Sequence, residues 1–564
     1  MPSRLGEKLL EQGLISAEDL DEAIAVQQKT KQYLGKILLE SGRIDERALL
    51  QVLAEQHDIA FMDLRHTEIP PDVIAQVPAK FARHYNIMPV SISENVMTVA
   101  TADPFDVWPM DDLQTHIGCR VEKVLSPSED IQEAIARHYG VAADTIERIM
   151  AEEPRTETST AGIQTGAVED LEKMAGDASV IQLVNQVFHQ AIEERATDIH
   201  LEYFHDEAAL RYRVDGILQD AQVSGDIKYL YPAIVSRIKI MSGLDIIERR
   251  LPQDGRARVK IGAREYDLRV SVMPTIHGEN VVVRILPTTM LLSLADLGLA
   301  PGDLGTLERL IQYTNGILFV TGPTGSGKST TLYAALKKLN GKERKLVTIE
   351  DPVEYQLKGV SQVQVKPKIG LTFARALRSM LRHDPDVIMV GEIRDLETAN
   401  IAVRAALTGH LVLSTLHTND AASGVTRLID IGIQPYLVSS AVRAFIAQRL
   451  VRVLCPECKQ PYELSDDTLR QFGAEPGRAS VTAYRPVGCE ACHQRGYRGR
   501  TGIYEVITLN EKIRTLILET VSSDALKKAA AEAGMRTLKQ DGFEKVKQGV
   551  TTPEEVLRVT QMEE

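Results

Sequence analysis

The strongest constraint on the fold is a glycine-rich segment near the middle of the chain that matches the pattern G-x-x-x-x-G-K-[ST]. An apolar run at residues 316–321 predicts a buried strand before it, and residues 330–339 predict a helix after it. In this setting, backbone N–H groups and the helix N-terminus can face phosphates. The loop consists of Gly322, Pro323, Thr324, Gly325, Ser326, Gly327, Lys328, Ser329 and Thr330. We expect Lys328 to reach the β- and γ-phosphates and the Ser329 hydroxyl to bind magnesium, which predicts a nucleoside triphosphate site.

Length and charge narrow the class of protein. At 564 residues the chain is too long for one hydrophobic core, so we expect three or four domains. Its formal net charge of −13 argues against a general nucleic-acid binder, which needs a basic face. The sequence has no signal-peptide core and no apolar run of about 18 residues, so we expect a cytoplasmic chain that reaches membranes only through partners.

The chain opens with an internal repeat whose second copy follows 29 residues after the first, as Gly6 and Gly35 illustrate. The first copy contains Arg4, Leu5, Gly6, Leu9, Gly13, Leu20, Ile24 and Gln27; the second contains Tyr33, Leu34, Gly35, Leu38, Gly42, Leu49, Leu53 and Gln56. The i, i+4 spacing of the later leucines and isoleucine predicts helices, with Ser16 as the N-cap of one of them.

Beyond the repeat, alternating strand-like and helical runs predict a multidomain α/β protein. We expect a helical repeat module at 1–57, a small α/β domain at 58–145, a flexible linker at 146–176, a second α/β domain at 177–290, and a catalytic domain at 291–564. Strands that alternate with helices after residue 291 predict a parallel sheet, and the last part of the chain, 505–564, reads as helical.

Polar residues follow three strand-like runs after the phosphate loop. They are Glu350, Asp351 and Glu354 after the first run, Glu392 after the second, and His417 after the third. Carboxyl ends of parallel strands meet at one edge of a sheet, where ligands bind. We expect Glu392 to act on the magnesium side, Glu354 or Glu350 to polarise the attacking water, and His417 to sense the γ-phosphate.

Four of the five cysteines form two C-x-x-C pairs, Cys455 with Cys458 and Cys489 with Cys492. Two such pairs fit a tetrahedral zinc site with four thiolates, which has no open position for catalysis. Two disulfides are the alternative, and a cytosolic chain disfavours them. We therefore expect a structural zinc module at residues 453–500, with Cys119 as a small buried side chain.

The motifs at 322–330, 348–354, 390–395 and 408–420 together resemble the assembly and secretion ATPases of type II secretion systems and type IV pili. The resemblance implies a RecA-like P-loop core with a parallel central sheet, preceded by a PAS-like domain. It also implies a homohexamer that hydrolyses ATP between protomers, where Arg256 and Arg269 complete a neighbour's site. A four-cysteine module is typical of the extension or secretion motors of this family.

The N-terminal repeat is similar to the cyclic di-GMP-binding module of some secretion and pilus ATPases, which implies that the sixteen repeat residues named above bind this dinucleotide. Tyr33 departs from the pattern, because it stands where the second copy would have arginine. The alternative is a repeated helical hairpin that docks the cytoplasmic domain of a membrane partner.

The combined expectation is a cytoplasmic hexameric ATPase with ATP and magnesium, structural zinc and a cyclic di-GMP regulator. It would act on the inner membrane through a platform and the cytoplasmic domains of assembly proteins, with no nucleic acid as partner. Two other classes stay open: a nucleic-acid motor with a zinc finger, and a second-messenger receptor whose ATPase core is vestigial. Secretion and pilus extension share all of these motifs.

Overall fold

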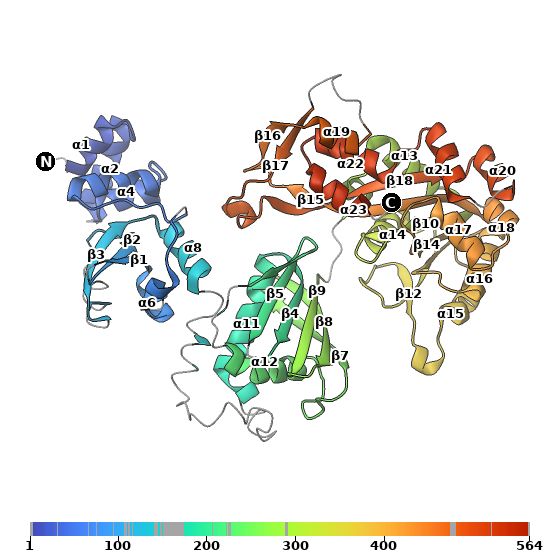
Figure 1. Ribbon diagram of the computed structural model, residues 1–564, viewed down its shortest axis with the longest axis horizontal. Coiled ribbons are helices and arrows are strands. Elements are labelled where there is room, and N and C mark those ends of the chain that lie inside the picture. The colour runs from blue at the N-terminus through green and yellow to red at the C-terminus, as the bar shows by residue number, and fades with distance from the viewer. Residues whose placement is uncertain are drawn as a thin grey trace. The chain divides into compact units, whose positions relative to one another are not determined.

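A computed structural model describes most of the chain, and its elements are labelled in Figure 1. The described residues are 4–30, 32–65, 67–74, 76–93, 95–105, 110, 113–114, 117–139, 145–146, 149, 174–205, 207–221, 223, 227–287, 292–473, 481–519 and 522–561. Most of the expected linker at 146–176 therefore lies outside the described residues. The chain divides into two compact units, residues 1–263 with 267–285 and residues 264–266 with 286–564. Within the described ranges, no helix has both the length and the apolar character that crossing a membrane requires.

Two helical hairpins of the same design open the first unit. They are α1 (Arg4–Glu11) with α2 (Ala17–Thr30), and α3 (Leu34–Glu40) with α4 (Glu46–His57). The repeated glycines allow the helices to approach each other closely. A β-carbon at Gly6 would lie 2.7 Å from Leu20 Cδ1, and one at Gly35 would lie 3.2 Å from Leu49 Cδ2. The repeat in the sequence is thus a duplicated packing unit.

A small α/β fold follows the hairpins. Its elements are α5 (Pro71–Ile74), α6 (Ala79–Tyr85), β1 (Ile87–Ser93), β2 (Val96–Thr101), β3 (Arg120–Leu125) and α8 (Ser128–Tyr139). The sheet has the order β1-β2-β3, with β1 and β2 antiparallel and β2 and β3 parallel. Arg47 on α4 joins this fold to the hairpins through ion pairs with Asp63 (2.9 Å) and Asp130 (2.5 Å).

The first unit also contains a six-stranded sheet of order β6-β5-β4-β9-β8-β7, drawn in green in Figure 1. The elements are α11 (Ala178–Glu193), β4 (Ala196–Tyr203), β5 (Ala208–Val214), β6 (Ile217–Asp220), α12 (Ile227–Met241), β7 (Gln253–Ile261), β8 (Arg264–Pro274) and β9 (Glu279–Pro287). Both helices pack against the sheet and against each other. The buried Tyr212 hydroxyl on β5 donates a hydrogen bond to the Val187 carbonyl of α11 (3.1 Å).

The second unit is built on a seven-stranded sheet of order β12-β11-β13-β14-β10-β15-β18. Its strands are β10 (Gly316–Thr321), β11 (Leu346–Glu350), β12 (Val360–Gln364), β13 (Val387–Val390), β14 (Leu411–Leu416), β15 (Val442–Leu454) and β18 (Tyr497–Thr508). The first six strands in this order are parallel, and β18 is antiparallel to β15. Every residue of β10, β13 and β14 is buried, which explains why these strands read as uninterrupted apolar runs.

Helices cover this sheet and form a hydrophobic core on each face. They are η2 (Leu294–Leu297), α13 (Pro301–Leu310), α14 (Lys328–Leu339), α15 (Phe373–Met380), α16 (Leu396–Leu407), α17 (Ser423–Asp430), α18 (Pro435–Ala441), α20 (Glu511–Glu519), α21 (Ser523–Glu532), α22 (Leu538–Lys547) and α23 (Pro553–Thr560). The short helix η3 (Pro367–Ile369) is exposed. Successive residues of β10 alternate between the two cores, with Phe319 in one and Leu318 in the other. The expected α/β class with a mainly parallel sheet is confirmed.

The cysteine segment is an insertion between the paired strands β15 and β18. It contains β16 (Gln460–Glu463), α19 (Asp466–Gln471), β17 (Thr482–Arg485) and η4 (Glu490–Cys492), with β16 and β17 as a separate two-stranded sheet.

Two sequence expectations about local structure have clear outcomes. The N-cap expected at Ser16 is confirmed, because its hydroxyl accepts a hydrogen bond from the Asp19 N–H (3.2 Å). The helical segment expected to begin at residue 505 is wrong at its start. Residues 505–508 continue β18, because they pair in register with β15, where Glu505 faces Ala447.

Candidate active site

The phosphate loop joins the carboxyl end of β10 to the start of α14, and β15 passes directly beneath it. Gly322 has a φ of +149° and Gly327 a φ of +89°. A β-carbon at Gly322 would lie 2.6 Å from the Gln448 carbonyl oxygen, and one at Gly327 would lie 2.7 Å from Gln448 Nε2. Only glycine fits at both positions without displacing the backbone or the side chain of Gln448. The Thr331 hydroxyl donates to Gln448 Oε1 (2.7 Å), which fixes α14 to the same strand.

Lys328, the lysine of the loop, is enclosed by the loop itself and is only 8% exposed. Its Nζ donates hydrogen bonds to the carbonyl oxygens of Gly322 (2.8 Å) and Pro323 (2.9 Å). Burial lowers the pKa of Lys328 to about 8; the positive charge of Arg449 lowers it as well, and the negative charge of Glu392 opposes the shift. The ammonium therefore lies in the loop with backbone carbonyls as its hydrogen-bond acceptors.

Glu392 and His417, which follow the adjacent strands β13 and β14, meet beside this lysine. Glu392 Oε2 lies 3.4 Å from His417 Nε2 and accepts a hydrogen bond from Arg394 Nε (2.6 Å). Burial and the charge of Lys328 lower the pKa of His417, so its imidazole is neutral at neutral pH. A carboxylate, a neutral imidazole and an ammonium thus converge at one edge of the sheet, as expected for parallel strands.

The three acids after β11 differ in their surroundings. Glu350 is 3% exposed, and its carboxylate accepts hydrogen bonds from Tyr333, from Thr348 Oγ1 (2.6 Å) and from Gln362 Nε2 (3.1 Å). Of the two residues expected to polarise water, the geometry therefore favours Glu354 over Glu350, whose oxygens are occupied within the protein. Asp351 is exposed.

Arg256 and Arg269, expected to complete a neighbouring site, lie on β7 and β8 of the first unit. These strands are neighbours in the six-stranded sheet, so both arginines belong to the same sheet. Arg256 is exposed and Arg269 is half-buried. Their contribution to a neighbour's site stays a prediction.

Sequence reasoning missed Arg449 on β15, which is only 5% exposed. Its guanidinium donates to the carbonyl oxygens of Gln448 (3.1 Å) and Asn419 (2.6 Å), so it ties the segment after β14 to the strand beneath the phosphate loop. The signal in the sequence was a glutamine–arginine pair at the centre of a largely apolar strand, where a buried charge needs partners.

The four paired cysteines meet at the ends of β15 and β18, and all four sulfurs lie within 4.8 Å of one another. The Sγ–Sγ distances are 3.7 Å for Cys455–Cys489, 3.9 Å for Cys458–Cys492 and 3.7 Å for Cys489–Cys492. Disulfide sulfurs would be about 2.0 Å apart, whereas four thiolates around zinc at about 2.3 Å stand about 3.8 Å apart. Backbone N–H groups of Gly488 and Gly496 donate to sulfurs of this cluster. The residues fit a zinc ion, and the disulfide alternative does not hold.

Comparison of the sequence with known proteins identifies the family of this chain. Residues 173–558 match the sequence profile of the type II/IV secretion system protein family, and residues 57–145 match that of the MshEN domain. The type IV pilus assembly ATPase PilB of Myxococcus xanthus is 43% identical over 561 residues, with 99% of each chain covered. The chain belongs to the type II/IV secretion system protein family.

Two further similarities are consistent with this membership. The type II secretion system protein E of Xanthomonas campestris pv. campestris is 41% identical over 567 residues, covering 99% of this chain and 98% of that protein. The crystal structure of the Yersinia pseudotuberculosis ATPase DotB has a TM-score of 0.50 at 21% identity, covers 68% of this chain and 94% of that one, and supports the fold. The chain is a P-loop ATP hydrolase of this family.

In this secretion-family ATPase, the sixteen repeat residues expected to bind cyclic di-GMP lie before the MshEN match, which begins at residue 57. Leu9, Leu20, Leu38 and Leu49 are at most 6% exposed and form the core of the two hairpins. Tyr33 is 76% exposed and stacks on Phe105, with ring centroids 6.1 Å apart and 12° between the planes. The ligand role of these residues stays a prediction.

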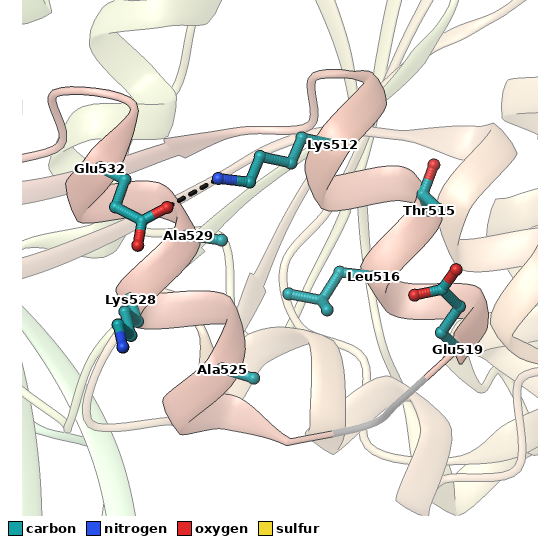
Figure 2. Close-up of a pocket in the computed structure, with 8 residues that line it drawn as sticks. All are labelled: Lys512, Thr515, Leu516, Glu519, Ala525, Lys528, Ala529 and Glu532. Carbon is teal, nitrogen blue, oxygen red and sulfur yellow. Dashed lines mark hydrogen bonds and ion pairs between the residues drawn. The ribbon is translucent and has the colours of Figure 1, made fainter.

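A separate cavity of about 610 Å³ lies between α20 and α21 of this ATPase. Figure 2 shows its apolar side chains, Leu516, Ala525 and Ala529, with the Lys512–Glu532 ion pair (2.6 Å) joining the helices at one end. Its lining includes no residue of the phosphate loop or of the strand ends that carry Glu392 and His417. It is therefore not the nucleotide site.

Proposed function

We propose that this ATPase is the motor that drives assembly of a type IV pilus or of a type II secretion pseudopilus. The observation that carries the proposal is the convergence of Lys328, Glu392 and His417 at one sheet edge in a chain that aligns with a pilus assembly ATPase over 99% of its length. ATP hydrolysis at this edge supplies the energy for assembly, and the features of the chain fit both branches.

Each residue at this edge has a proposed role. The loop from Gly322 to Thr330 binds the triphosphate, with Lys328 on the β- and γ-phosphates and Ser329 on magnesium. Glu392 acts on the magnesium side, and Glu354 polarises the attacking water. Asp351 is a further catalytic acid in the same segment as Glu354. Neutral His417 contacts the γ-phosphate and reports its loss after hydrolysis.

The working unit in this proposal is a homohexamer with each ATP between two protomers. Arg256 and Arg269 would supply guanidinium groups to a neighbour's γ-phosphate, where they stabilise transition-state charge. The six-stranded sheet with α11 and α12 would be the PAS-like domain, and the seven-stranded sheet would be the RecA-like core. Closure between these two parts on ATP binding would be the step that produces movement.

Two bound groups complete the proposal. Zinc held by Cys455, Cys458, Cys489 and Cys492 stabilises the end of the β15–β18 hairpin and takes no part in hydrolysis. The N-terminal repeat would bind cyclic di-GMP, which would regulate the ATPase.

The protein would work in the cytoplasm, at the inner membrane, where it contacts a platform protein and the cytoplasmic domains of assembly components.

The direct test is the steady-state ATPase rate of the full-length protein and its Glu392→Gln variant. We expect the variant to lose at least about 100-fold in kcat, because it removes a charge beside the magnesium and phosphates. Glu397→Gln is a matched control, since Glu397 is an exposed glutamate on α16 that pairs with Arg378 on α15. Equal rates for Glu392→Gln and the wild type would contradict the assigned role.

A mixing experiment tests the shared site. Arg269→Ala and Lys328→Ala proteins should each be inactive alone, because each lacks one half of every site. Mixed hexamers contain some interfaces with an intact loop facing an intact arginine, so hydrolysis should reappear on mixing. If the mixture stays inactive while wild-type subunits exchange under the same conditions, the arginines do not act across the interface.

Cyclic di-GMP binding is tested by calorimetry on the full-length protein and on Tyr33→Arg. We expect the wild type to bind, and Tyr33→Arg to bind about tenfold more tightly, because arginine adds a charge-assisted hydrogen bond at an exposed position. Tyr436→Arg controls for added charge, since Tyr436 is 60% exposed in the other unit. No binding by either the wild type or Tyr33→Arg would leave the repeat as a docking module.

A further inference from the structure

We propose that Tyr333 is a positioning residue for hydrolysis, which fixes the segment that carries Glu354 to the helix that begins at Lys328. The role rests on the proposed function of Glu354 as the group that polarises water. Nothing in the motifs of the sequence points to Tyr333, because it lies beyond the phosphate-loop pattern.

Tyr333 lies on α14, five residues after Lys328, and its side chain is 1% exposed. The phenol hydroxyl donates a hydrogen bond to Glu350 Oε2. It accepts hydrogen bonds from the backbone N–H groups of Glu354 (3.2 Å) and Tyr355 (3.4 Å). One donor and two acceptor positions are all that a hydroxyl has, so every one is used, and two of the three contact the segment that carries Glu354.

The partner on the other side of the hydroxyl is itself fixed. Glu350 at the end of β11 also accepts from Thr348 Oγ1 (2.6 Å) and Gln362 Nε2 (3.1 Å). Gln362 on β12 closes the ring, because its Nε2 donates to the Tyr355 carbonyl (2.9 Å) and its Oε1 accepts from the Leu357 N–H (2.7 Å). The buried network therefore holds residues 354–357 from two strands and one helix.

The tyrosine ring adds to this hold, since it packs edge-on against Tyr355 with ring centroids 5.6 Å apart. Phenylalanine at position 333 would keep that packing and remove only the hydroxyl. The N–H of Glu354 would then lose the Tyr333 hydroxyl as an acceptor. The backbone that carries the Glu354 carboxylate would no longer be held in place there. Misplacing a catalytic group by about 1 Å can cost about 100-fold in rate.

The test measures kcat and KM for ATP on the full-length Tyr333→Phe protein. We expect kcat to fall about 10- to 100-fold with KM within twofold of the wild type, because Lys328 and the loop glycines are untouched. Tyr212→Phe is the matched control: its phenol is also buried and hydrogen-bonded to the backbone, at the Val187 carbonyl, but in the six-stranded sheet. Its kcat should equal that of the wild type. A wild-type kcat for Tyr333→Phe, or a loss confined to KM, would overturn the proposal.

A double-mutant cycle then asks whether Tyr333 acts through Glu354. We expect Tyr333→Phe to cause no further loss in a Glu354→Gln background, since a displaced glutamine has no catalytic effect to lose. Additive losses would overturn the positioning role and leave the function of Glu354 intact. Full activity of Glu354→Gln alone would overturn the assignment of Glu354 and the proposal with it. Absence of hydrolysis in the wild type would instead contradict the proposed function.

Discussion

Binding of ATP should weaken as the pH rises through about 8, because the buried Lys328 loses its proton there. In the nucleotide-free protein its pKa is about 8 instead of the ordinary 10.5. If only the ammonium form binds the triphosphate, the apparent Kd is multiplied by one plus ten to the power of pH minus pKa. That factor is about 2 at pH 8 and about 11 at pH 9, whereas a lysine of ordinary pKa would change Kd by less than about 10% over the same range.

The assay is calorimetric titration with a magnesium complex of a non-hydrolysable ATP analogue at several pH values from about 7 to 9. His417 does not contribute, since its pKa is lowered from 6.5 and it is neutral throughout this range. Lys328→Arg is the control. Because a guanidinium keeps its charge over this range, the Kd of this variant for the analogue should not change with pH. A wild-type Kd that changes less than twofold between pH 7 and 9 would refute the reasoning. The stability of the fold should change in the opposite direction to ATP binding. Between about pH 8 and 10.5 the lysine is protonated in the unfolded chain but not in the folded one, so the free energy of unfolding should rise with pH there.

Three further outcomes are expected. Cys455→Ser should release one zinc ion per chain in a colorimetric assay and lower the melting temperature, whereas Cys119→Ser, which changes a cysteine outside the cluster, should do neither. Although burial raises the pKa of Glu555, hydrogen bonds from Arg558 and Arg452 bring it down to about 2. Glu555→Gln should therefore lower the free energy of unfolding by about 3 kcal/mol at pH 7, and the difference in denaturant unfolding should disappear as the pH falls from about 4.5 to 2. Gly327→Ala should weaken ATP binding at least about tenfold, because its β-carbon meets Gln448, while Gly341→Ala, which meets nothing within 4 Å, should bind normally.

Local patterns in the sequence predicted the elements that depend on neighbours along the chain. The uninterrupted apolar run of β10 and the glycines after it specified a buried strand and a phosphate loop, and both occupy the expected residues. The spacing of the cysteines likewise predicted the sulfur cluster, because two C-x-x-C pairs supply the four thiolates of one tetrahedral metal site.

Features that depend on distant pairing were outside what these patterns could predict. Gln448 and Arg449 contact the loop segments only because β15, far along the chain, pairs with β10. The motif alone could not distinguish Glu350 from Glu354 as the residue that polarises water. The structure distinguishes them because Glu350 is buried and hydrogen-bonded by Tyr333 and Gln362, which come from a helix and a different strand.

The strand β15 connects the phosphate loop of this ATPase to its cysteine module. Gln448, near its middle, supports the phosphate loop, and Cys455 follows its last residue, so that about 23 Å of one extended chain separates the support of the loop from the four-cysteine cluster. A strand of a sheet transmits tension along its covalent backbone and hardly stretches. We expect a displacement of the inserted module to reach the base of the phosphate loop through this strand.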